Sequence, residues 1–199
     1  MSEIAIETIK RLRELTGVGM TEAKKALLEK GGDFDKALEA MRIKGLAKVD
    51  KRAEREARAG IIDAYVHSQR IGVLVEVNCE TDFVARNQLF QTFVHNIALH
   101  IAASSPLYVT VADVPTEALK KERQLIMAEL KNDSKPPAIL AKIAAGKLDK
   151  YYDQVCLLNQ PYVKNPDQTV ADFVNEHAAK LGENIVIRRF CRIMLGEVN

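Results

Sequence analysis

The sequence predicts an α+β fold, in which a small helical domain is followed by a core of sheet and helices. Over residues 1–47, apolar side chains recur at helical spacing, interrupted by glycine-containing breaks. From Gly60 onward the apolar period changes to two, which is typical of half-buried strands. Ala, Lys, Glu, Ile and Leu are common and Trp is absent, a composition that favours helices. Strand and helix patterns then alternate to the end of the chain, which indicates helices packed on one face of a sheet.

The N-terminal domain is expected to contain three short helices in a minimal bundle. The first helix is predicted over residues 3–15, and breaks at 16–20 and 31–32 separate it from the next two. The glycines of the first break are expected to allow positive φ. Thr21 and Asp33 are expected to cap the second and third helices, since both have a short side-chain oxygen. The expected core residues share helical spacing: Ile6, Ile9, Leu12, Ala23, Ala26, Leu27, Ala37, Leu38 and Met41.

Residues 48–58 form a mixed-charge segment that predicts a solvated, helical linker. Glu54 and Arg58 lie at the i,i+4 spacing at which opposite charges meet on a helix. Phosphate contact is the alternative interpretation. It is disfavoured because the segment contains three acids and no aromatic side chain for base stacking.

The core is expected to cover residues 59–199 and to begin with a hairpin. Its strands are predicted over 61–67 and 70–79, joined by a turn at 67–70. The other expected elements are, in order, a long helix after Asp82 that ends near residues 104–106, a helical hairpin over about residues 115–150, a strand near 155–158, a capping-box helix from Thr169 to Gly182 and a last strand over 185–194.

Composition excludes several classes of protein. The 199 residues include 29 Lys and Arg against 27 Asp and Glu, and the net charge of +2 is far from the basic field of a dedicated nucleic-acid binder. No apolar run approaches the roughly 20 residues of a membrane span. The first seven residues carry acids and no apolar segment, so a signal peptide is not expected.

The three cysteines are far apart and odd in number. Without a CxxC pair, neither a zinc site nor a disulfide framework is predicted, and reduced thiols in the cytosol are the plain interpretation. Cys191 lies in the last predicted strand. A buried structural thiol is favoured there over pairing with its own copy across a two-fold axis.

No catalytic constellation is found. The phosphate-loop patterns GxxxxGK[ST] and GxGxxG are absent, and the four histidines lack metal spacing, so hydrogen-bonded or solvated histidines are expected. His95 and His100, five residues apart, diverge around their helix. The acids near the hairpin come with no sign of a pocket that would support paired-carboxylate chemistry. They are Asp63, Glu76, Glu80 and Asp82. We therefore expect no catalytic residue, no metal and no cofactor.

The junction between the second core strand and the following helix, residues 78–87, holds the most informative side chain. Thr81 and Asp82 are placed to cap the first helical turn, which puts Phe83 at the corner. Phe83 precedes Phe90 by seven residues, so spacing alone favours packing in the core. Projection of the ring toward a partner is the alternative, and a first-turn position is compatible with both.

Two segments resemble signatures of the translation elongation factor Ts family. They are TGVGMTEAKKAL at residues 16–27 and EVNCETDFVA at residues 76–85. Shorter matches are LHIAAS at 99–104, NQPYV at 159–163 and GENI at 182–185. The resemblance covers essentially the whole chain. Long members of the family carry the α/β core twice, whereas this chain holds it once, so it resembles the short bacterial form.

The resemblance implies a guanine-nucleotide exchange factor that releases GDP from the GTPase elongation factor Tu and performs no chemistry itself. It implies a UBA-like N-terminal domain that docks through the turn formed by Gly17, Val18, Gly19 and Met20. It also implies a nucleotide-release wedge formed by Thr81, Asp82, Phe83 and Val84, with Phe83 inserting near the Mg²⁺ and phosphate site. The family's use of this aromatic reverses the preference drawn from spacing.

The implied partner is elongation factor Tu in its GDP-bound and nucleotide-free states. A single core implies a homodimer and a 2:2 complex, in the cytoplasm, with no membrane and no direct nucleic-acid contact. Two functions of other classes are weighed against this one. The first is an RNA-associated adaptor that uses the bundle and the charged linker, and the second is a metal-free hydrolase that uses the acids near the hairpin.

Overall fold

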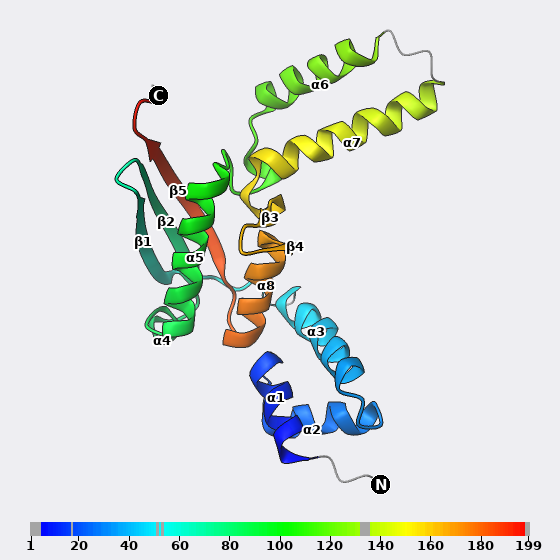
Figure 1. Cartoon of the computed structure of the whole chain (residues 1–199), viewed down its shortest axis with the longest axis vertical. Helices are drawn as coiled ribbons and strands as arrows, with labels where there is room; N and C mark the ends of the chain where they lie inside the picture. Colours follow the sequence, from blue (N-terminus) through cyan, green and yellow to red (C-terminus); the bar gives the residue numbers. More distant parts are fainter. Residues whose placement is uncertain (1–4, 17, 51, 53, 132–135, 198–199) are drawn as a thin grey trace. The chain divides into compact units, whose positions relative to one another are not determined.

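The computed structural model describes residues 5–16, 18–50, 52, 54–131 and 136–197, with only the backbone described for 42 and 45–50. It is a mixed helix-and-sheet structure, which confirms the α+β prediction (Figure 1). The chain divides into two compact units. The first comprises residues 1–62, 76–94 and 173–187, and the second comprises residues 63–75, 95–172 and 188–199. The predicted domain boundaries at 1–47, 48–58 and 59–199 stay a prediction.

The elements follow one another along the chain as α1 (Ile6–Thr16), α2 (Met20–Glu29), α3 (Phe34–Asp50), β1 (Ala59–His67), β2 (Ile71–Cys79), α4 (Asp82–Ala85), α5 (Gln88–Ser104), the 3-10 turn η1 (Val111–Asp113), α6 (Thr116–Leu130), α7 (Pro137–Val155), the 3-10 turn η2 (Leu157–Asn159), β3 (Pro161–Tyr162), β4 (Asn165–Thr169), α8 (Val170–Leu181) and β5 (Val186–Met194).

Helices α1 to α3 share a small apolar core in the first unit. Its buried members are Ile9, Leu12, Ala23, Ala26, Leu27, Ala37 and Met41, with Val18, Phe34 and Leu38 packed against them. All the expected core residues are therefore accounted for except Ile6, whose side chain is 63% exposed because it lies in the first turn of α1.

The caps of the bundle helices agree only in part with expectation. Asp33 caps α3 by accepting a hydrogen bond from the Lys36 N–H (3.0 Å), as predicted. The prediction for Thr21 is wrong, because α2 begins at Met20 and Gly19 occupies the cap position without a side-chain bond. Gly31 and Gly32 end α2 with φ of 64° and 86°, values that glycine adopts without a steric penalty.

The segment after the bundle is helical only up to Asp50, where α3 ends. The described residues from 52 to 58 form turns and irregular backbone, so the prediction of a helical linker is wrong for them. Without a helix, Glu54 and Arg58 are not neighbours on one face. Arg58 Nε instead donates to Glu56 Oε1 at 2.6 Å.

One sheet has the strand order β1-β2-β5. The β1–β2 hairpin is confirmed, and its two-residue turn places Ser68 and Gln69 at φ of 47° and 56°, the left-handed region that such turns require. β2 alternates as predicted: Val73, Val75 and Val77 are buried and Leu74 is exposed. β5 ends beside the start of β2, where the Leu195 N–H donates to the Arg70 carbonyl at 2.8 Å.

The helix predicted after Asp82 is interrupted. α4 ends at Ala85, and the side chain of Asn87 accepts a hydrogen bond from the Leu89 N–H (2.8 Å), which starts α5 afresh. Phe83 therefore does not continue the helical stripe of Phe90. Helix α5 ends at Ser104, close to the predicted position.

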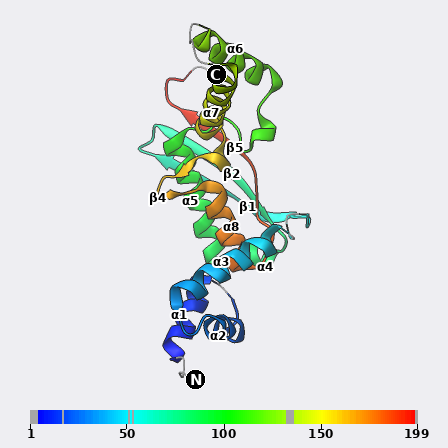
Figure 2. The same cartoon turned by 90° about the vertical axis from the view of Figure 1, so that its right-hand side faces the viewer.

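In the second unit, α6 and α7 pack against each other, and Figures 1 and 2 both show them side by side. Lys147 of α7 forms an ion pair with Glu129 of α6. Because α7 continues to Val155, the strand predicted at 155–158 is wrong. Cys156 forms only an isolated parallel bridge with Tyr108, and a 3-10 turn follows.

The two-stranded sheet of β3 and β4 is absent from the prediction, since the β4 sequence NPDQT has the composition of a turn. The capping box of α8 is confirmed. Thr169 N–H donates to Asp172 Oδ2 (3.0 Å), and Asp172 N–H donates to Thr169 Oγ1 (3.1 Å). None of the helices in the described part of the chain combines the length and apolar character that crossing a bilayer requires.

Candidate partner-binding corner

The side chain of Phe83 projects from the corner between β2 and α4. It is 92% exposed, more than any other large apolar side chain described. The preference for core packing drawn from spacing is therefore wrong, because the break at residues 86–87 takes α4 out of the register of α5. Leaving a phenyl ring in water forgoes roughly 1.5–3 kcal/mol of burial free energy, which a partner surface could recover.

Thr81 begins the helical turn that carries Phe83. Its backbone is extended (φ −132°), and its hydroxyl oxygen accepts a hydrogen bond from the Val84 N–H at 3.4 Å. The predicted cap is thus confirmed for Thr81. Asp82 is the first residue of α4, where a carboxylate is favoured by the positive end of the backbone dipoles.

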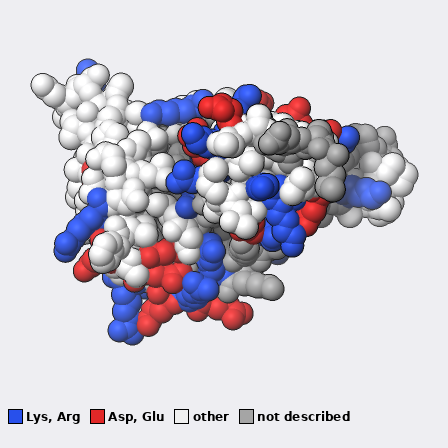
Figure 3. Space-filling model, turned by 90° about the horizontal axis from the view of Figure 1, so that it is seen from below, with Lys and Arg blue, Asp and Glu red and all other residues white. Residues whose placement is uncertain are grey.

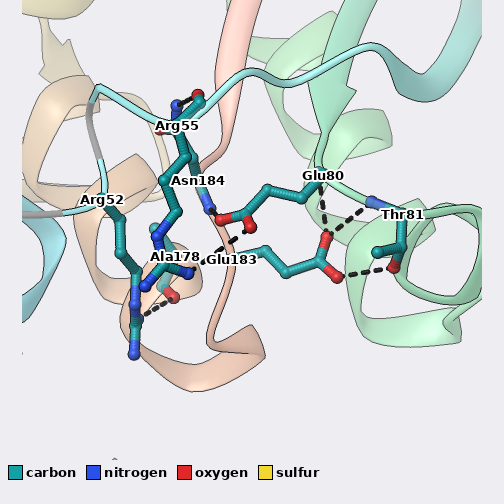
Figure 4. A network of polar contacts seen from close by, with 7 residues as sticks. All are labelled: Arg52, Arg55, Glu80, Thr81, Ala178, Glu183 and Asn184. Carbon is teal, nitrogen blue, oxygen red and sulfur yellow. Dashed lines mark hydrogen bonds and ion pairs between the residues drawn. The ribbon is translucent and has the colours of Figure 1, made fainter.

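A glutamate far along the chain holds the backbone of this corner (Figure 4). Glu183 Oε2 accepts hydrogen bonds from two consecutive backbone donors, the N–H of Glu80 (3.0 Å) and the N–H of Thr81 (3.1 Å). Its other oxygen, Oε1, accepts the hydroxyl proton of Thr81 at 2.6 Å. The Thr81 hydroxyl therefore donates to Glu183 while accepting from Val84.

Glu80 makes the reciprocal contact (Figure 4). Its Oε1 accepts the Asn184 N–H at 2.7 Å, and its Oε2 lies 3.5 Å from a terminal nitrogen of Arg55. The side-chain amide of Asn184 donates to the Arg55 carbonyl at 2.7 Å. Arg52 reaches the Ala178 carbonyl at the end of α8 (3.4 Å). Each of the two glutamates thus holds the backbone of the segment that carries the other.

The thiol of Cys79 completes the inner side of the corner. It donates to the Thr81 carbonyl at 3.3 Å. Burial raises the pKa of this thiol to about 11, and the carboxylates of Glu183 and Asp82 act in the same direction, so it stays protonated at neutral pH. Cys156 is also buried, whereas Cys191 is exposed, so the prediction that Cys191 is a buried structural thiol is wrong.

The second predicted contact segment is the turn before α2. Gly17 lies outside the described residues. Gly19 has an ordinary φ of −68°, so it does not use the positive φ that a glycine allows. Val18 packs against the bundle core, and Met20 is 39% exposed. Within this turn, Met20 is therefore the apolar side chain that is available to a partner.

The histidines are hydrogen-bonded, as predicted, and His95 pairs with one of the acids near the hairpin. His95 contacts Asp63 at 2.9 Å, and His67 contacts Tyr65 at 3.0 Å. His177 donates from Nδ1 to the Phe173 carbonyl at 2.9 Å and stacks on Phe93. In the part of the chain that the structure describes, no three His, Cys, Asp or Glu side chains come together as a metal site would require.

Buried His100 occupies a fixed tautomer. Its Nδ1 accepts the Val163 N–H at 3.2 Å, so its Nε2 carries the proton and donates to Gln160 (3.0 Å). Burial lowers the pKa of both His100 and His177, which keeps the two rings neutral.

Charge on the face shown in Figure 3 is mixed, with Lys and Arg side chains interspersed among Asp and Glu. Sequence reasoning missed Glu183 and Arg55 as parts of the corner. In the sequence, the GENI run at 182–185 stands out only by its resemblance to the family. Glu183 lies 102 residues from Thr81, so no periodicity indicates their contact.

Together, the sheet, its helices and the hydrogen-bonded corner define an α+β protein with a large apolar ring exposed at that corner. The family model described as elongation factor TS matches residues 3–197. Elongation factor Ts of Moorella thermoacetica is 52% identical over 195 residues, covering 98% of this chain and 96% of that protein. The protein of the same name from Thermodesulfovibrio yellowstonii is 48% identical over 194 residues, covering 98% and 97%. The chain belongs to the elongation factor Ts family.

Proposed function

We propose that this chain accelerates release of GDP from elongation factor Tu by inserting Phe83 near the Mg²⁺ and phosphate site. The family's role is nucleotide exchange on that GTPase. The observation that carries the finer proposal is the position of Phe83, which is 92% exposed on a corner held by side-chain hydrogen bonds. Thr81, Asp82 and Val84 complete the wedge as its cap and first turn.

Exchange by this route needs no chemistry in the chain, because it is a coupling between two binding equilibria. A factor that weakens GDP binding by some ratio is itself bound more weakly, by the same ratio, when GDP is present. Truncation of an aromatic anchor typically costs about 2–4 kcal/mol. At about 1.4 kcal/mol per decade, loss of the wedge corresponds to roughly 30- to 1000-fold in the rate of GDP release.

The test is dissociation of fluorescent GDP from elongation factor Tu with the wild-type chain and with Phe83→Ala. Leu107→Ala is the matched control, since it truncates another exposed apolar side chain (65% exposed) outside the corner. We expect Phe83→Ala to keep the wild-type melting temperature and lose most of the stimulation, while Leu107→Ala keeps it. Unchanged stimulation by Phe83→Ala would overturn the wedge.

We further propose that α1 to α3 form the UBA-like docking domain, with the segment Gly17, Val18, Gly19 and Met20 against the GTPase. Met20 supports this because it is the exposed apolar side chain of the segment, while Val18 supports the turn from the bundle core. Met20→Ser should weaken binding of elongation factor Tu with little effect on the melting temperature, which calorimetric titration would measure.

The remaining proposals concern assembly. We propose that α6 and α7 form a protruding helical hairpin that adds contacts to the GTPase, and that the chain works as a homodimer in a 2:2 complex. Exposed apolar side chains of the second unit support a further protein contact: Val66, Leu74, Ile193 and Leu195 are 54–67% exposed. Sedimentation of the purified chain, alone and with elongation factor Tu, tests the stoichiometry.

A further inference from the structure

The ring of Phe83 has little of its own to keep it in place. With 92% of its surface exposed, it gains almost no packing against the rest of the chain. The helix that carries it, α4, has four residues, far below the length at which a helix is stable by itself. The direction of the ring therefore depends on the backbone of residues 80–84 and on whatever holds that backbone.

The contacts that hold it converge on one carboxylate. Glu183 accepts hydrogen bonds from the N–H of Glu80, the N–H of Thr81 and the hydroxyl of Thr81, at 3.0, 3.1 and 2.6 Å. All three donors precede α4 directly. Hydrogen bonds to a carboxylate acceptor are about twice as strong as those between neutral groups, and Glu183 is only partly exposed.

We propose that Glu183 is a positioning residue for nucleotide release: its carboxylate holds the corner so that Phe83 projects in the direction that enters the GTPase. The proposal rests on the proposed function of Phe83. It assigns to Glu183 no contact with the nucleotide or with the GTPase. Its effect passes through the Glu80 and Thr81 amides and the Thr81 hydroxyl to α4.

Two substitutions, Glu183→Ala and Glu183→Gln, test how much the carboxylate of Glu183 contributes to holding the corner. Glu183→Ala leaves two amides and a hydroxyl without their acceptor. Glu183→Gln keeps the length of the side chain and one acceptor oxygen, so it should retain part of the stimulation of GDP release. Glu176→Ala is the matched control, because it removes a glutamate of α8 that pairs with Lys180 (2.7 Å).

The experiment combines two measurements on the full chain. The first is the rate of GDP release from elongation factor Tu as a function of chain concentration. The second is hydrogen exchange at the Glu80 and Thr81 amides, followed by NMR. We expect Glu183→Ala to lower the plateau rate about 10- to 100-fold, Glu183→Gln to lie between it and wild type, and Glu176→Ala to stay within about twofold.

The double variant tests whether Glu183 acts through Phe83 or only stabilises the fold. If Glu183 acts through the ring, adding Glu183→Ala to Phe83→Ala should cause no further loss of rate, whereas general destabilisation would add to it. Protection of the two amides should fall about tenfold or more in Glu183→Ala, with other core amides unchanged. Should Glu183→Ala fail to fold, the plateau rate and amide protection of Glu183→Gln decide.

The outcomes distinguish this proposal from the one on which it rests. If the wild-type chain does not stimulate GDP release, or if Phe83→Ala keeps full stimulation, the proposed function of Phe83 fails and this proposal fails with it. If Phe83→Ala loses stimulation but Glu183→Ala and Glu183→Gln keep it, the wedge stands and the positioning role of Glu183 is overturned. Additive losses in the double variant would also overturn it.

Discussion

The corner at residues 80–84 and the turn at residues 18–20 are both proposed contacts with the same partner, but they are stabilised differently. The corner is held by polar side chains from distant parts of the chain, with Glu183 more than 100 residues from Thr81. The turn is held by apolar packing of Val18 against helices that are its neighbours in sequence. A rigid projecting ring requires the first arrangement, since a ring that supplied its own packing would be buried.

Removing a buried side chain of the bundle formed by α1 to α3 should produce the largest loss of stability. It should also show whether the bundle and the corner unfold independently. Leu27 is fully buried among α1, α2 and α3, and Leu27→Ala should cost about 2–5 kcal/mol of unfolding free energy. Hydrogen exchange should rise throughout α1 to α3 while the Glu80 and Thr81 amides keep their protection. Equal loss of protection in the corner would show that the two regions are not independent.

The matching change in the corner is Thr81→Val, which keeps the shape of the side chain and removes its hydroxyl. Two hydrogen bonds are lost, to Glu183 and from Val84. Loss of a helix cap of this kind costs about 0.5–2 kcal/mol. Urea unfolding gives the stability, and GDP release should fall more than stability alone predicts. A fall in stability with full stimulation of release would break the link between the cap and the ring.

Lowering the pH should destabilise the part of the chain after residue 60 before it destabilises α1 to α3. All four histidines lie beyond residue 60, and the folded-state pKa of His100 and of His177 is lowered by burial. The unfolded chain therefore binds more protons, so the stability contributed by neutral rings is present above the unfolded pKa of about 6.5 and falls as the pH drops below it. Urea unfolding at pH 7.5 and 5.5 should show the loss.

The control variant for this pH dependence of stability is His177→Phe, which keeps an aromatic ring beside Phe93 and removes one titrating group. Its stability should depend less on pH across this interval. Hydrogen exchange should show α8 losing protection before α1 to α3. An identical pH dependence in the variant would exclude His177 as a source of the effect.

The smallest effect is expected at Gly19. Its φ is −68°, and an added Cβ would meet no atom within 4 Å, so Gly19→Ala should change the unfolding free energy by less than about 0.5 kcal/mol. Thermal unfolding measures this. A larger loss would mean that the turn depends on glycine in a way that its backbone geometry does not reveal.

Sequence reasoning located what local patterns control. The alternation of β2, the turn at 68–69, the Asp33 cap and the Thr169–Asp172 capping box all follow from short-range chemistry. The prediction from sequence failed where the apolar spacing of Phe83 and Phe90 competed with a helix cap at Asn87. Asn87 restarts the helix after α4, and this single cap separates Phe83 from the stripe that spacing assigned to it.

The candidate site was predictable only in part. The exposed ring was located by resemblance, and Thr81 by its capping chemistry. The side chains that hold them, Glu183, Asn184 and Arg55, come from segments brought together by the tertiary fold. A charged residue in a loop looks solvated in sequence, because nothing local records the backbone donors that the fold places against it.

The most direct test of the central claim is the rate of fluorescent-GDP release from elongation factor Tu at saturating concentrations of wild type, Phe83→Ala and Leu107→Ala. The account predicts that Phe83→Ala lowers the stimulated rate by roughly 30- to 1000-fold with an unchanged melting temperature, while Leu107→Ala matches wild type. A Phe83→Ala chain that folds, binds and releases GDP at the wild-type rate would contradict it.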